Sequence, residues 1–222
     1  MDGKQENDQA PQQAGRAHNH AVSRLRRAAA SALALGTLAA CGGGGTGPGM
    51  PGVPLSALLA LPRNDATFAP TSPVTFSVRN NLLSTFTIRH PDASSTLFAT
   101  FTFAPHSIVS VNNVVLADTS TVAVTVTLTS GQYGFTVSPA NMVFNIAGEP
   151  TVTVAYGAYG DLSVYTQTST YPSAAAYEQA LNLWRENTPD HWLLGRNSGH
   201  VNPDTVASAL ETPGRYLIAA PR

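Results

Sequence analysis

Short runs of alternating apolar and polar residues begin near Thr67 and continue to the C-terminus. In the clearest run, residues 121–129, valine and leucine at positions 122, 124, 126 and 128 alternate with threonine and alanine. A period of two over these nine residues predicts a β-strand with one face directed toward a core. Similar runs predict further strands at 74–78, 85–88, 97–103, 135–137, 151–156 and 161–165.

Turn-forming residues separate these runs and mark the ends of the strands. Asn80-Asn81, Asn112-Asn113, Ser130-Gly131 and Ser138-Pro139 are typical of such turns. Many short strands joined by turns are typical of a sandwich or a barrel. We therefore predict an all-β, immunoglobulin-like β-sandwich that contains one or two subdomains.

The strand pattern is interrupted once in the C-terminal part of the chain. Ser173 precedes three alanines, and a serine in this place can cap a helix through its hydroxyl, so we expect a loop or short helix at 172–179. A hairpin loop is expected at 195–202. Strands are expected at 180–186, 192–194, 205–210 and 216–219.

The N-terminal segment has a different organisation. Residues 28–40 form an apolar run of 13 residues that follows Arg24, Arg26 and Arg27 and ends in small residues. A basic region, an apolar region and a small-residue site together predict a secretory signal, and the run is too short to span a bilayer. Residues 42–54 are mostly glycine, proline and threonine, which predicts a disordered tether. Residues 55–61 are apolar and could form a short helix or a strand that packs on the domain.

The apolar run ends in Leu38-Ala39-Ala40-Cys41. These four residues resemble the lipobox of bacterial lipoproteins at every position. The resemblance implies diacylation of the Cys41 sulfur, signal cleavage on the amino side of Cys41 and a second acylation at the new amine. It also implies Sec export and a lipid anchor in the bacterial cell envelope, in the outer membrane if the source has two membranes. The alternative is a non-lipidated signal with an incidental cysteine.

These observations predict four regions along the chain. Residues 1–40 are a lipoprotein signal, 41–60 a lipid-anchored tether, 61–157 a β-sandwich region and 158–222 a C-terminal β region. The last two regions either share one core or have separate cores. The basic region is long for a signal, so translation could also begin at Val22 instead of Met1.

Composition narrows the function classes. Charged residues make up 11% of the chain, against about 25% in typical globular proteins, and the net charge is −1. This balance offers no electrostatic footprint for nucleic acid. Cys41 is the only cysteine, so no intrachain disulfide can form.

The C-terminal half carries several packing and turn motifs. They are Val137-Ser138-Pro139, residues 150–156, residues 181–186 with Trp192, and Pro213-Gly214 before Tyr216. In these motifs the chain resembles the ZU5-like, immunoglobulin-like β domains of bacterial surface lipoproteins. The resemblance implies a structural or interaction module and no enzymatic activity.

The sequence predicts no catalytic residue, no metal site and no cofactor. Gly195-Arg196-Asn197-Ser198-Gly199 lacks the G-x-S-x-G spacing of a serine hydrolase. His90 with Asp92, and Asp190 with His191, lie beside proline, where a turn is the simpler explanation. Calcium binding in loops is the remaining metal alternative, with Asp118, Asp161 and Glu149 as candidate ligands.

Aromatic residues offer one candidate binding feature. Tyr171, Tyr177 and Trp192 could form an exposed platform for a glycan or another small ligand, although such rings more often fill a core. Trp184 has the position of a core-facing strand residue. Tyr216 follows Pro213-Gly214 and is expected to pack on the sheet or to fix a turn through its hydroxyl.

The sequence thus predicts a non-enzymatic lipoprotein of the cell envelope that presents its β domain for a structural or protein-interaction role. The alternative is a lipoprotein that binds a glycan or small ligand through exposed aromatic rings. Expected partners are the membrane, through the lipid anchor, and envelope proteins or glycans, but not nucleic acid.

Overall fold

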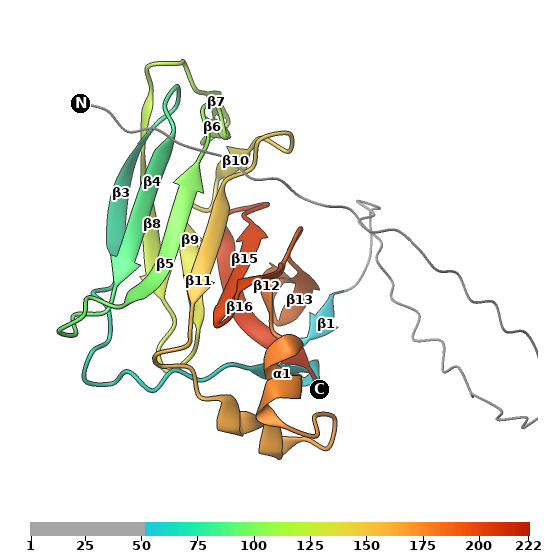
Figure 1. Ribbon diagram of the computed structural model, residues 1–222. Helices are drawn as coiled ribbons and strands as arrows, with labels where there is room; N and C mark the ends of the chain where they lie inside the picture. The colour runs from blue at the N-terminus through green and yellow to red at the C-terminus, as the bar shows by residue number, and fades with distance from the viewer. Residues whose placement is uncertain (1–51) are drawn as a thin grey trace, which may run out of the picture. The chain divides into compact units, whose positions relative to one another are not determined.

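Two antiparallel β-sheets pack face to face in the computed structural model, which describes residues 52–222 (Figure 1). The larger sheet has eight strands in the order β1-β13-β12-β16-β9-β8-β3, with β2 also paired to β16. The second sheet has the order β14-β15-β11-β5-β4, and a small sheet has the order β10-β6-β7. The predicted all-β sandwich is therefore confirmed. The predicted signal, its cleavage residues Leu38, Ala39 and Ala40, and the lipidation residue Cys41 lie outside the described residues.

The element bounds follow in chain order. They are β1 (Val53–Pro54), η1 (Leu55–Ala57), β2 (Leu58–Ala60), β3 (Val74–Arg79), β4 (Ser84–Arg89), β5 (Leu97–Phe103), β6 (Ile108–Val111), β7 (Val114–Val115), β8 (Thr121–Leu128), β9 (Gly134–Ser138), β10 (Met142–Phe144), β11 (Thr151–Ala155), η2 (Leu162–Gln167), α1 (Ala174–Gln179), β12 (Asn182–Thr188), β13 (His191–Leu194), β14 (Gly199–Asn202), β15 (Thr205–Ala209) and β16 (Gly214–Pro221).

Strand β8 shows how the alternating pattern builds the sandwich. Val122, Val124 and Val126 are buried, whereas the intervening residues are exposed or half-buried. Val124 pairs with Phe76 of β3, so both strands direct their apolar faces inward. The strands predicted at 74–78, 85–88, 97–103, 121–129, 135–137 and 151–156 are confirmed within one or two residues at each end.

The segment 161–165, predicted as a strand, is instead the start of helix η2. The Asp161 carboxylate accepts hydrogen bonds from the backbone N–H of Ser163 at 2.9 Å and from its hydroxyl at 2.6 Å. Such a local side-chain cap satisfies backbone groups at a helix start and competes with strand pairing. The strand prediction was wrong because it considered only the alternation of apolar and polar residues, which contains no information about this cap.

Of the loop or short helix expected at 172–179, the structure has the helix. Helix α1 begins at Ala174, and the Ser173 hydroxyl accepts a hydrogen bond from the backbone N–H of Ala176 at 3.2 Å. Tyr177 is the buried residue of this helix. Its hydroxyl donates a hydrogen bond to the Leu59 carbonyl of β2, and this contact holds α1 against the end of the sandwich near β1 and β2 (Figure 1).

The tether predicted for residues 41–60 is wrong for residues 53–60, which belong to the fold, and its residues 41–51 lie outside the described part of the chain. Residues from Val53 onward form β1, η1 and β2, and β2 pairs with β16. Leu58 and Leu59 are buried at 3% and 1% exposure. Full burial of a leucine side chain contributes about 1.5–3 kcal/mol, which offsets the ordering of this segment. The folded body therefore includes the residues from Val53 onward.

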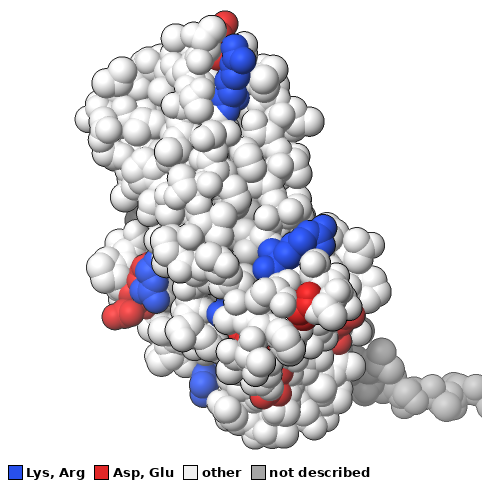
Figure 2. Space-filling view, turned by 90° about the vertical axis from the view of Figure 1, so that its left-hand side faces the viewer, with Lys and Arg blue, Asp and Glu red and all other residues white. Residues whose placement is uncertain are grey.

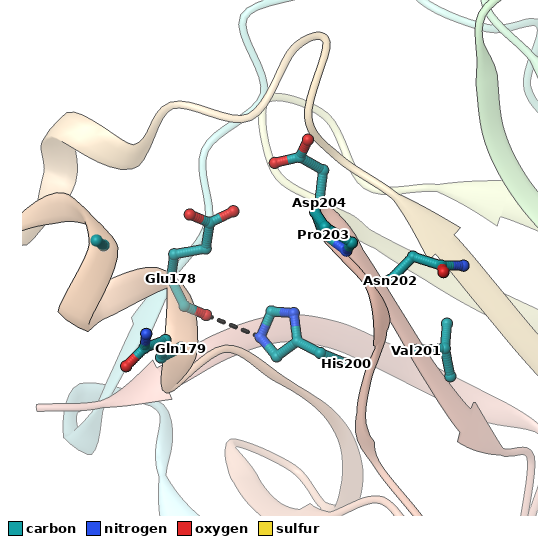
Figure 3. Close-up of a pocket in the computed structure, with 8 residues that line it drawn as sticks. Glu178, Gln179, His200, Val201, Asn202, Pro203 and Asp204 are labelled. Atoms are coloured by element: carbon teal, nitrogen blue, oxygen red, sulfur yellow. Dashed lines mark hydrogen bonds between the residues drawn. The ribbon is translucent and has the colours of Figure 1, made fainter. Parts of the chain in front are cut away.

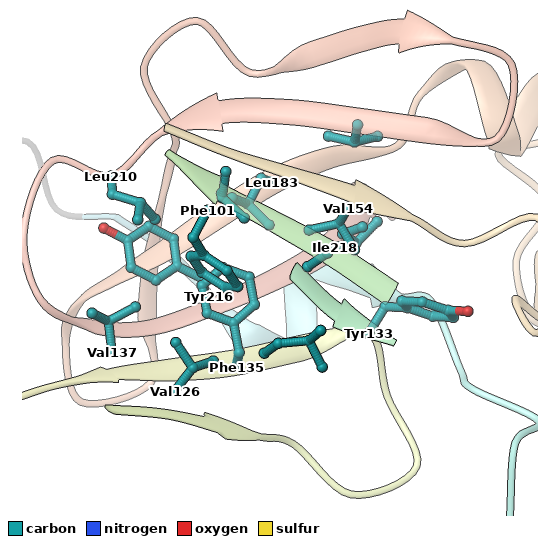
Figure 4. Close-up of a cluster of buried hydrophobic side chains, with 14 of the residues drawn as sticks. Phe101, Val126, Tyr133, Phe135, Val137, Val154, Leu183, Leu210, Tyr216 and Ile218 are labelled. Carbon is teal, nitrogen blue, oxygen red and sulfur yellow. The ribbon is translucent and has the colours of Figure 1, made fainter. Parts of the chain in front are cut away.

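One hydrophobic core joins the two predicted β regions. Its centre contains three aromatic rings, in which Phe135 stacks on Tyr216 with centroids 5.3 Å apart and meets Phe101 edge to face at 5.3 Å (Figure 4). Phe101 and Phe135 come from region 61–157, and Tyr216 comes from region 158–222. Of the two alternatives left open by the sequence, the structure has the shared core.

A smaller cluster covers the outer face of the larger sheet. It contains Trp184, Trp192 and Leu217, together with Leu58 and Ala219. Because side chains alternate across a strand, Leu217 joins this cluster while its neighbours Tyr216 and Ile218 face the main core. Burial on both faces explains the uninterrupted apolar run near the C-terminus.

Tyr216 fixes a turn through its hydroxyl, in agreement with the sequence expectation. The hydroxyl donates a hydrogen bond to the backbone carbonyl of Thr212 and accepts one from the Thr212 N–H at 3.3 Å. Burial raises the pKa of Tyr216 to about 12, so the group stays a donor at neutral pH.

Replacing Tyr216 by phenylalanine is expected to lower the free energy of unfolding by about 1–2 kcal/mol. The variant keeps the ring stack on Phe135 but leaves the Thr212 carbonyl without its side-chain donor. Urea denaturation followed by circular dichroism measures the difference. An unchanged midpoint would show that this pair of hydrogen bonds contributes nothing.

Candidate functional site

The aromatic residues predicted as a platform are placed mainly in the interior. Tyr177 and Trp192 are 0% and 2% exposed. The Tyr177 hydroxyl donates to the Leu59 carbonyl at 3.2 Å, and Trp192 packs beneath the Arg215 guanidinium at 5.4 Å. Tyr171 is half-buried, and its hydroxyl donates to the Pro221 carbonyl. Of the two alternatives given for these rings, packing in the fold and an exposed platform, the structure has packing for Tyr177 and Trp192.

Both tryptophans are expected to be shielded from a soluble quencher. Trp184 is 9% exposed and donates from its indole N–H to the Ala219 carbonyl at 3.0 Å, and Trp192 is 2% exposed. Acrylamide should therefore quench the native fluorescence several-fold less than that of the urea-unfolded chain. Equal quenching in the two states would contradict the burial of these rings.

The residues considered for calcium do not lie together. Asp118 lies 3.7 Å from His106, Asp161 caps η2, and Glu149 forms an ion pair with Arg196 at 3.2 Å. Among residues 52–222, no three histidine, cysteine or acidic side chains are arranged to hold a metal ion.

His90 belongs to a buried polar cluster at the base of the second sheet. Its Nδ1 lies 3.0 Å from the Phe68 carbonyl oxygen and 3.3 Å from Asp65 Oδ2. Asp65 in turn accepts from Arg63 Nε at 2.7 Å. These contacts hold the segment that links β2 to β3 against the sandwich.

Asp92, two residues beyond His90, has a separate role in a turn. Its carboxylate accepts hydrogen bonds from the Thr96 hydroxyl at 2.5 Å, the Tyr159 hydroxyl at 2.7 Å and the Thr96 N–H at 2.8 Å. These three donors, the Thr96 hydroxyl first, lower the pKa of Asp92 to about 2.

We expect Asp92 to stabilise the fold at neutral pH and to lose this effect in acid. Its folded pKa of about 2 lies below the ordinary value of 3.8, so its contribution is full above about pH 4 and disappears as pH falls toward 2. The Asp92→Asn variant should show a smaller loss of stability over this interval than the wild type. Urea unfolding at several pH values measures how the free energy of unfolding of each protein changes with pH. Equal pH dependence of the two proteins would contradict the lowered pKa of Asp92.

A surface groove lies between helix α1 and the β14–β15 hairpin and has a volume of about 410 Å³. We call it the α1–hairpin groove. It is lined by Ala175, Glu178, Gln179, His200, Val201, Asn202, Pro203 and Asp204. Figure 3 shows the carboxylates of Glu178 and Asp204 on the same side of the groove, with the His200 ring between α1 and the hairpin.

Tyr156, the residue after β11, contacts two polar side chains of the groove, Glu178 and His200. Its buried hydroxyl donates to Glu178 Oε1 at 3.1 Å and lies 3.5 Å from His200 Nδ1. Burial, and then the nearby carboxylates of Glu178 and Asp204, raise the pKa of Tyr156. The hydroxyl therefore remains protonated and holds the Glu178 carboxylate by one of its two oxygens.

His200 and Asp204 are positioned by the backbone around them. His200 Nε2 donates to the Glu178 carbonyl oxygen at 2.9 Å, because a carbonyl can only accept (Figure 3). Asp204 has φ of 61° in the turn of the hairpin. A side chain on Gly157 would come within 2.5 Å of the Asp204 Cβ, so the glycine allows Asp204 to pack closely.

Sequence reasoning did not identify Glu178, His200 or Asp204 as a group. The available signals were an acidic residue in a predicted helix and a histidine in a predicted loop, and neither has a distinctive spacing. The groove forms only because α1 and the hairpin, which β12 and β13 separate in the chain, meet beside Tyr156.

Charged side chains are sparse on the face drawn in Figure 2. Acidic and basic residues lie in small groups there, with broad uncharged areas between them.

None of the helices in the described part of the chain has the length and apolar content needed to cross a membrane. No protein-family model matches the sequence, and comparison with curated proteins and with solved structures gives no match.

Proposed function

We propose that this protein is an exported lipoprotein of the bacterial cell envelope, held at the membrane by acyl chains on Cys41. Its β-sandwich, which we propose is of the ZU5-like, immunoglobulin-like type, has a non-enzymatic structural or protein-interaction role. The observation that carries the proposal is the Leu38-Ala39-Ala40-Cys41 sequence directly after a basic and an apolar segment.

The position at which the fold begins is compatible with this proposal. Val53 of β1 follows Cys41 by twelve residues. A chain of this length spans at most about 40 Å when fully extended. An anchor at Cys41 would therefore keep the sandwich close to the membrane, where it could contact other envelope components.

Metabolic labelling with a clickable palmitate analogue tests the lipid anchor directly. Cells that express the full-length chain should incorporate the label into this protein, and inhibition of the lipoprotein signal peptidase should leave a heavier precursor. An unlabelled protein of the size expected after cleavage would overturn the lipoprotein assignment and leave only a secreted β-sandwich.

The second candidate function is the binding of a small ligand, with the α1–hairpin groove in place of the aromatic platform. The groove has a volume within the range of about 300–1,000 Å³ that is common for small-molecule sites. It also brings carboxylate, imidazole and amide groups to one place.

A further inference from the structure

We propose that the α1–hairpin groove binds a small organic cation through an alkyl ammonium group. This inference rests on the second candidate function, ligand binding by the exported domain, and adds the chemical class of the ligand. It does not depend on the lipid anchor.

The first argument is the uncompensated negative charge of the groove. Glu178 and Asp204 line it, and the lining residues include no lysine or arginine. In residues 52–222, the ion pairs that arginines make with acidic side chains involve Asp65, Glu149, Glu186 and Glu211. In a chain with few charges, two carboxylates that line one groove with no lysine or arginine among the lining residues favour a cationic ligand.

The second argument distinguishes an ammonium group from a guanidinium group. One oxygen of Glu178 already accepts the hydrogen bond of Tyr156 at 3.1 Å. A guanidinium group is recognised best when both oxygens of a carboxylate accept its planar fork. An ammonium group has three donors on a compact charge and can bond to single oxygens of two carboxylates. Because one Glu178 oxygen accepts from Tyr156, the groove favours an alkyl ammonium group over a guanidinium group.

The third argument concerns the rest of the ligand. Ala175, Val201 and Pro203 supply apolar surface beside the two carboxylates. The amides of Gln179 and Asn202 offer both donors and acceptors at the rim. A short alkyl chain that ends in an ammonium group fits this combination, and the volume of about 410 Å³ restricts the ligand to a small molecule.

Isothermal titration calorimetry of the full-length protein in non-ionic detergent tests the proposal with 1,5-diaminopentane. We expect saturable binding with a dissociation constant of about 1 mM or lower. Raising the salt from about 10 mM to about 150 mM should weaken the binding, because screening shortens the range of the carboxylate charges. The uncharged isostere 1,5-pentanediol should not bind, and pentylguanidine, whose only charged group is a guanidinium that is bound best by both oxygens of one carboxylate, should bind less tightly than pentylamine.

Two variants locate the binding in the groove. Glu178→Gln and Asp204→Asn should each weaken diamine binding about fivefold or more, which corresponds to the loss of one charge pair. Glutamine can still accept the Tyr156 hydrogen bond, so the first variant should fold, and its thermal unfolding midpoint checks this. Asp118→Asn removes one exposed carboxylate elsewhere and is the matched control, with unchanged binding expected.

Three results would overturn the proposal. They are no saturable binding of the diamine up to about 10 mM, equal binding of the diol, or equal weakening by Asp118→Asn and by the groove variants. Each of these is independent of the palmitate-labelling result, so failure of the ligand assignment can be told apart from failure of the lipoprotein assignment.

Discussion

Replacing Cys41 by serine is expected to move the protein from the membrane fraction to the soluble fraction. Each acyl methylene buried in the bilayer contributes about 0.8 kcal/mol, and a single chain binds only marginally, so stable attachment requires several chains. Serine has no thiol to accept the diacylglycerol group, so the variant lacks the acyl chains that provide this attachment. The expected effect is a shift of nearly all of the protein.

Membrane fractionation followed by immunoblotting measures this shift. Thr46→Ser, a conservative change outside the Leu38-Ala39-Ala40-Cys41 motif, is the control and should remain with the membrane. Retention of the Cys41→Ser protein after a high-salt wash would show that another segment holds it. The proposed anchor would then be incorrect, although the sandwich itself would be unaffected.

Replacing Phe135 by alanine is expected to lower the free energy of unfolding by about 3–5 kcal/mol. The ring is 1% exposed and touches both Phe101 and Tyr216 at the centre of the core (Figure 4). Its removal loses apolar burial and leaves a cavity that three strands must close. Since small domains are stable by about 5–15 kcal/mol, this is a large part of the total.

Urea denaturation of the Phe135→Ala variant also tests the shared core. The whole sandwich should unfold in one transition at a lower urea concentration, because Phe135 and Tyr216 come from the two regions predicted along the chain. Val115→Ala, at a side chain that is 74% exposed, is the control and should change stability by less than about 0.5 kcal/mol. A second transition at the wild-type midpoint would mean that the C-terminal region has a core of its own.

Several elements could be predicted because their cause is local. The alternation in residues 121–129 requires only the two-residue period of a strand, and β8 forms there. The Ser173 hydroxyl caps α1 by accepting a hydrogen bond from the N–H of Ala176, only three residues further along the chain. Residues close together in the sequence are therefore enough to predict this cap. The same local reasoning did not recognise that Asp161 caps a helix. Residues 161–165 were therefore predicted as a strand, whereas η2 begins at Leu162.

The elements that were missed are short, and three of them, β1, β2 and β10, pair with strands far along the chain. Strands β1, β7 and β10 are two or three residues long and carry too few positions to show a period. Strand β2 lies in the apolar segment 55–61, for which a short helix and a strand were both left open, and its pairing with β16 at the other end of the chain decides between them. Strand β14 was expected in a loop and forms an edge of the second sheet by pairing with β15.

The sequence by itself determined the strand-rich class, the helix cap and the motif that predicts a lipid anchor, because each depends on residues close together in the chain. Only the tertiary structure decided that Tyr177 and Trp192 are interior and that Glu178, His200 and Asp204 line one groove. Burial and side-chain proximity are set by how the sheets and α1 pack. An aromatic or acidic residue has the same local pattern whether that packing buries it or leaves it facing solvent.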